Sequence, residues 1–144
     1  MKNLLDNFPS ISSADILCLG DSNTHGYCAN PNDCADHGIR FNEDERWTCR
    51  LQKALGDEYL VTEEGLSGRT TVFVDPIHES MDALSVAYAL LKSHEVIDLL
   101  IIMLGTNDCK TVFNVTASDI ARGAMALIRA VRAFPSQWDA EASA

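Results

Sequence analysis

The sequence predicts an α/β fold in which a parallel β-sheet is flanked by helices. Two observations carry this prediction. Short apolar runs alternate with longer amphipathic segments, and apolar runs end at polar, glycine-containing loops. Strands that alternate with helices form βαβ units, whose right-handed crossovers make the strands parallel. Ligands bind beyond the carboxyl ends of such strands, so we expect the polar loops to gather there.

Three apolar runs predict the strands. Residues 14–19 form a buried strand that stops at Gly20, and residues 59–62 form a second, shorter one. Residues 96–104 are nearly all apolar, which is typical of a parallel strand covered on both faces. Residues 63–71 hold two glycines, as expected of a loop whose backbone comes close to another group.

Amphipathic patterns predict three helices between and after these strands. Residues 42–55 open with Asn42 and Glu45 in capping-box spacing. Thr116 and Asp119 cap a last helix, which Pro135 interrupts. The apolar face of the middle helix is predicted to hold Met81, Leu84, Tyr88 and Leu91, and that of the last helix Ile120, Ala124, Leu127, Ile128 and Val131.

Length and composition describe an ordinary globular protein. The 144 residues fit a single domain, with residues 135–144 as a disordered or divergent tail. The formal net charge of -10 disfavours nucleic acid and anionic lipid surfaces as partners. We find no membrane span and no signal peptide, which favours a cytoplasmic location. Five cysteines are an odd number, so we expect free thiols.

Three polar loops hold the candidate catalytic residues. Ser22 follows a buried strand and a glycine, where a hydroxyl can be held rigidly at the rim of a cleft. Acyl transfer also needs donors for the developing oxyanion, and the backbone N–H of Gly68 and the amide of Asn107 could supply them. Taken singly, each residue also fits a plain turn or cap.

Together the loops 20–24, 65–70 and 105–108, which read GDSNT, GLSGRT and GTND, resemble the first three sequence blocks of the SGNH (GDSL-type) hydrolase superfamily. The connecting segments resemble its bacterial arylesterase and acyltransferase branch. The resemblance implies a flavodoxin-like α/β/α fold and a serine esterase that needs no cofactor and no metal. It makes Ser22 the nucleophile, with the oxyanion hole formed by its own N–H, Gly68 and Asn107. The implied substrate is a small-molecule ester.

The family's fourth block, an Asp-x-x-His, is not found after Asn107. We interpret Asp75 and His78, which have this spacing, as a loop coincidence, and we expect His25 to line the mouth of the substrate pocket. Only three of the family's five strands are found, so we expect the last strands and helix to be missing and the strand at 96–104 to leave an open apolar edge. That edge favours a homo-oligomer or completion by another chain.

Two alternatives to an active esterase remain open. The chain is a non-catalytic or partner-completed fragment, or it is a flavodoxin-like module in which residues 22–26 cradle a phosphate. Asp21 and the absence of nucleotide-binding motifs count against phosphate binding. A metal site at Cys28, Cys34 and His37 lacks usual zinc spacing, and Ser67 in a near Gly-x-Ser-x-Gly motif is a poor rival to Ser22.

Overall fold

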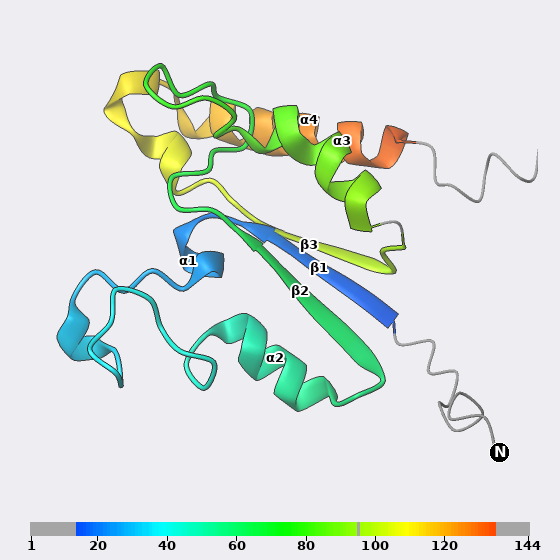
Figure 1. Cartoon of the computed structure of the whole chain (residues 1–144). Coiled ribbons are helices and arrows are strands. Elements are labelled where there is room, and N and C mark those ends of the chain that lie inside the picture. The colour runs from blue at the N-terminus through cyan, green and yellow to red at the C-terminus, as the bar shows by residue number, and fades with distance from the viewer. Residues whose placement is uncertain (1–13, 95, 135–144) are drawn as a thin grey trace, which may run out of the picture.

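A computed structural model describes residues 14–94 and 96–134, where one sheet of three parallel strands has the order β2-β1-β3. Figure 1 shows helices on both faces of the sheet, which confirms the predicted α/β architecture. The strands are β1 (Ala14–Gly20), β2 (Tyr59–Gly65) and β3 (Leu99–Met103). The longer helices are α2 (Trp47–Leu55) on one face, and α3 (Ala83–His94) and α4 (Ala117–Ala133) on the other. The predicted tail at 135–144 lies outside the described residues.

All three strands end at the same edge of the sheet. The last residue of β1, Gly20, is in register with Gly65 of β2 and with Met103 of β3. The loops after the strands therefore begin side by side (Figure 1). Short helical turns lie in these and the adjoining loops: α1 (Ser22–His25), η2 (Pro31–Asp33), η3 (Asn107–Cys109) and η4 (Thr111–Phe113).

The main core lies between the sheet and α3 and α4. Leu19 of β1 packs with Ala83, Ala87 and Leu127, which are at most 3% exposed. The predicted inner face of α3 is wrong, because Leu84 and Tyr88 are exposed while the two alanines are buried. Apolar residues occur almost all around this helix, and the small side chains are the ones that let it lie close to α4.

Helix α4 begins as predicted. Thr116 Oγ1 accepts a hydrogen bond from the backbone N–H of Asp119, and the Asp119 carboxylate accepts one from the N–H of Thr116 in return. The predicted inner face is confirmed at Leu127, which is fully buried, whereas Ile128 at its margin is 38% exposed.

Helix α2 begins later than predicted, at Trp47 instead of Asn42. Asn42 and Glu45 do bond to each other, but they close only a turn. The backbone of Arg46 is extended (φ -59°, ψ 134°), so the helix begins only after it. Its guanidinium lies 3.0 Å from Glu63 of β2 and donates to the carbonyl of Phe41. This buried arginine ties the loop before α2 to the sheet.

Strand β3 is only partly buried, and both of its ends are exposed on one face, which corrects the prediction of a strand buried on both faces. Alternate side chains of a strand point to opposite faces. Leu100 and Ile102 pack against the core of α3 and α4. Leu99 and Met103, which point the other way, are 51% and 39% exposed. Within the described residues β3 pairs with β1 alone, so its outer edge is open.

The carboxylate of Glu63 is one group through which pH affects the stability of this fold, and its effect can be tested. Although burial alone raises the pKa of this carboxyl, hydrogen bonds from Thr48 and Arg46 and the charges of Arg46 and Arg40 lower it overall. A group with a lowered folded-state pKa stabilises the protein fully above its unfolded pKa, about 4.3 for glutamate, and loses that effect as the pH falls through the folded pKa.

We therefore expect Glu63→Gln to lower the free energy of unfolding at neutral pH, and we expect the gap to the unsubstituted protein to close below about pH 4.3. Urea unfolding at a series of pH values measures the gap. The matched control is Glu58→Gln, which changes an exposed carboxyl. A gap that stays constant into the acid range would show that Glu63 does not act through its charge.

Candidate active site

Ser22 lies at the end of the central strand, as the first residue of α1. Asp21 caps this turn, because its Oδ1 accepts hydrogen bonds from the backbone N–H of Asn23 (2.8 Å) and from its side-chain amide (2.9 Å). The Asp21 side chain is 1% exposed, whereas Ser22 is half-buried and can be reached. The N–H of Ser22 has no intrahelical acceptor, since a helix leaves its first N–H groups unpaired.

Two glycines let α1 lie directly on the strand ends. A Cβ on Gly65 would come within 2.2 Å of the backbone nitrogen of His25, and one on Gly20 within 2.0 Å of Thr24 Oγ1. No real side chain fits at such distances. The turn that carries Ser22 is therefore packed against the end of β2, where the second predicted loop begins.

The second loop is tied to the first by the carbonyl of Gly20. This oxygen accepts hydrogen bonds from the N–H of Leu66 (3.1 Å) and from Arg69 Nη1 (3.2 Å). Arg69 also donates to the carbonyl of Glu64 and is 5% exposed. Its burial lowers the pKa of the guanidinium. Between Leu66 and Arg69, Gly68 has a φ of +92°, a conformation that favours glycine.

The third loop is tied to the second at two points. Asn107 Nδ2 donates to the carbonyl of Arg69 over 3.1 Å, which uses one of its two amide hydrogens and leaves the other for a ligand. The carboxylate of Asp108 is fully buried and accepts hydrogen bonds from the N–H and the hydroxyl of Thr71. Ser22, Gly68 and Asn107 therefore lie on three loops that hydrogen bonds join into one cluster.

Sequence reasoning missed the residues that hold this cluster together. Arg69 and Asp108 each follow a predicted oxyanion donor, and a charged residue beside a glycine or an asparagine carries no signal of burial. Lys110 was missed as well. Its ammonium lies 3.4 Å from Asp75 Oδ2 and 3.9 Å from the position that a Cβ on Gly68 would take. It gives the second loop a neighbouring positive charge.

None of the histidines within the described residues is hydrogen-bonded to Ser22. His25 ends the turn that Ser22 begins, and its carbonyl accepts a hydrogen bond from Arg40, so its place at a pocket mouth stays a prediction. His78 lies 3.4 Å from Asp75, whose carboxylate caps its own turn through the N–H of Ile77. The hydrogen bond from the N–H of Ile77 is the main reason that the pKa of Asp75 is lowered.

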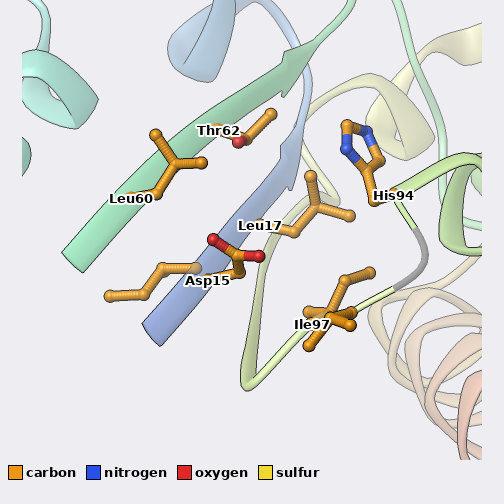
Figure 2. Close-up of a pocket in the computed structure, with 8 residues that line it drawn as sticks. Asp15, Leu17, Leu60, Thr62, His94 and Ile97 are labelled. Carbon is orange, nitrogen blue, oxygen red and sulfur yellow. The ribbon is translucent and has the colours of Figure 1, made fainter. Parts of the chain in front are cut away.

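The other features that could hold a ligand lie elsewhere. A cavity of about 100 Å³ is found at the amino end of β1 and β2 (Figure 2). Ser22, in contrast, follows the carboxyl end of β1. The cavity is lined by Asp15, Ile16, Leu17, Leu60, Thr62, His94, Val96 and Ile97.

The described part of the chain contains no group of three or more His, Cys, Asp or Glu side chains that could hold a metal ion.

The sequence from residue 18 to residue 138 matches the model of the GDSL-like lipase/acylhydrolase family. The chain belongs to this family. A comparison with curated proteins gave no match. The predicted family is thus confirmed for most of this GDSL-like chain, and the cluster of Ser22, Gly68 and Asn107 lies inside the matched range.

Solved structures are similar to this GDSL-like chain. The aryl esterase of M. smegmatis is 42% identical, with a TM-score of 0.71, over 80% of this chain and 52% of that one. Est24, a carbohydrate acetylesterase from Sinorhizobium meliloti, is 38% identical, with a TM-score of 0.74, over 82% of this chain and 54% of that one. AlinE4, an SGNH-hydrolase family esterase, is 22% identical (TM-score 0.60; 83% and 53% covered) and shows the shared fold alone.

The chain therefore spans little more than half the length of each of these structures. No helix among the described residues of this GDSL-like protein has both the length and the apolar character needed to cross a bilayer.

Proposed function

We propose that this chain hydrolyses carboxylic esters through an acyl-enzyme formed on Ser22. The observation that carries the proposal is the hydrogen-bonded junction of three loops, in which Arg69 bonds to the carbonyl of Gly20 and Asn107 bonds to the carbonyl of Arg69. The junction holds a reachable serine beside two loops that carry further hydrogen-bond donors. A serine esterase needs this combination of nucleophile and preorganised donors.

The chemistry follows from these positions. Ser22 Oγ attacks the ester carbonyl carbon, and the oxygen that becomes negative is stabilised by the N–H groups of Ser22 and Gly68 and by the second amide hydrogen of Asn107. The alcohol leaves, and water then hydrolyses the acyl-serine. An alcohol in place of water would give acyl transfer instead. The ammonium of Lys110, which lies close to Gly68, also stabilises the negative charge on this oxygen.

The proton of Ser22 needs an acceptor, and we propose that a polypeptide segment packed on the open edge of β3 supplies it. The only histidines of the chain are at positions 25, 37, 78 and 94, all before Asn107. Support for such a segment comes from β3, whose outer edge is open among the described residues and whose Leu99 and Met103 are exposed. An added strand or helix would cover this surface and bring its own base to the edge where Ser22 lies.

A small aromatic acetate is the substrate with which to begin. The similar structures include an aryl esterase and a carbohydrate acetylesterase, and p-nitrophenyl acetate combines an aryl leaving group with an acetyl group. Added imidazole can serve as the base, because none of the described histidines is hydrogen-bonded to Ser22. We expect hydrolysis above the Ser22→Ala background to rise with imidazole, and we expect mass spectrometry to place an acetyl group on Ser22.

Ser67→Ala tests the rival serine, which is exposed on the second loop, and it should leave the imidazole-dependent rate intact. Equal rates for the unsubstituted chain and Ser22→Ala at every imidazole concentration, in folded samples, would reject the proposal. The chain would then be a non-catalytic member of its family.

A further inference from the structure

The loop that follows the nucleophile turn is closed at its base by backbone pairing. Tyr27 and Arg40 form an antiparallel bridge, and the N–H of Cys28 donates to the carbonyl of Ile39 over 2.9 Å. Phe41 in turn donates to the carbonyl of Gly26 over 2.7 Å. Residues 27–40 thus leave the end of α1 and return to it.

The interior of this loop consists of two cysteines. Cys28 and Cys34 are each 2% exposed, and they are the two buried residues between positions 27 and 40. The apolar side chains that could have formed a core here, Tyr27 and Ile39, are 50% and 72% exposed. The loop therefore folds around a pair of thiols.

The two thiols are buried inside the same closed loop. The thiol of Cys28 donates to the carbonyl of Asn30 over 3.0 Å. The turn η2, which Asn30 caps and which contains Pro31, reverses the chain between the two cysteines. The other three cysteines lie apart from this loop, in β1, in α2 and in η3.

We propose that Cys28 and Cys34 form a reversible disulfide that fastens the loop behind the nucleophile turn. The oxidant is a low-molecular-weight disulfide. One protein thiolate attacks it, a mixed disulfide forms, and one small thiol leaves. The second cysteine then attacks the sulfur of the first and releases another small thiol. Two protein thiols are oxidised, and one small disulfide is reduced to two thiols.

The loop connects the cysteine pair to α1. Arg40, at the returning end of the loop, donates from Nε to the carbonyl of His25, the last residue of the turn that Ser22 begins. Burial, with a smaller contribution from neighbouring Cys28, raises the pKa of Cys34 to about 12. The reduced pair is therefore slow to react while the loop is closed, and exchange proceeds when the loop opens.

The test starts from the double variant Cys49→Ser/Cys109→Ser of the 144-residue chain, which keeps Cys18, Cys28 and Cys34. The protein is equilibrated with oxidised glutathione, and its thiols are then titrated in denaturant. We expect two of the three thiols to be lost, with a mass decrease of two hydrogens and no bound glutathione. Adding Cys34→Ser should abolish this loss.

Peptide mapping locates the bond without relying on a variant that must fold. A protease that cuts before aspartate separates residues 15–20, 21–32 and 33–35, which place the three cysteines on three peptides. We expect 21–32 and 33–35 to be joined before reduction and separate after it. We also expect slower tryptic cleavage after Arg40 in the oxidised protein. Three free thiols, mixed disulfides only, or a link to 15–20 would each overturn the proposal.

Discussion

Gly65→Ala is expected to unfold the protein or to lower its free energy of unfolding by about 3 kcal/mol or more. The added Cβ would lie 2.2 Å from the backbone nitrogen of His25 and 2.6 Å from the carbonyl carbon of Thr24. Backbone atoms cannot rotate away as a side chain can, so α1 itself must move off the end of β2. Ser22 would move with it, away from the loop that carries Gly68.

Urea unfolding measures this effect, with Gly38→Ala as the matched control. A Cβ on Gly38 would meet the Asp36 carboxylate at 3.1 Å, and that exposed side chain can turn aside. We expect the control to change the free energy of unfolding by less than about 1 kcal/mol. If both variants were equally stable, α1 would not pack on β2 as closely as the structure shows.

Asp108→Ala is expected to lower the free energy of unfolding by about 3 kcal/mol, because it removes the buried carboxylate that accepts hydrogen bonds from Thr71. The N–H of Thr71 donates to both oxygens of Asp108, at 3.1 and 3.2 Å, and its hydroxyl donates to Oδ1. Neither residue is exposed to water, so the donors left behind would lack a solvent partner. The change would also release the third loop from the second and free Asn107 to move.

Two further variants give this prediction its controls in the same unfolding experiment. Asp57→Ala removes an exposed carboxylate and should be nearly neutral. Asp108→Asn keeps an oxygen that can accept from Thr71, so its stability should fall between those of the alanine variant and the unsubstituted protein. An Asp108→Ala protein as stable as Asp57→Ala would show that the link between the loops contributes nothing.

Much of the fold could be predicted because local patterns agree with it. The apolar run before Gly20, the capping box at Thr116 and the nearly continuous apolar run that contains β3 each indicate one element, and the structure has all three elements. The polar loops were expected at one sheet edge because parallel strands end together, and they meet there.

The rest depended on contacts between residues distant in the sequence. Arg46 breaks the start of α2 because Glu63, in the next strand, binds its guanidinium. The inner face of α3 is set by Leu127 of α4, which selects Ala83 and Ala87 over larger neighbours. The role of Arg69 depends on the Gly20 carbonyl 49 positions away. Periodicity and spacing describe neighbours along the chain and therefore cannot reveal such partners.

The central position of β1 sets the order in which the site can be assembled during folding. β1 must pair with β2 and also with β3, which lies much later in the chain, and such distant pairing is slow compared with local contacts. An intermediate in which only β1 and β2 have paired would already hold Ser22 beside Gly68, but it would lack Asn107. We therefore expect ligand-binding competence to appear only in the last kinetic phase of refolding, when β3 docks.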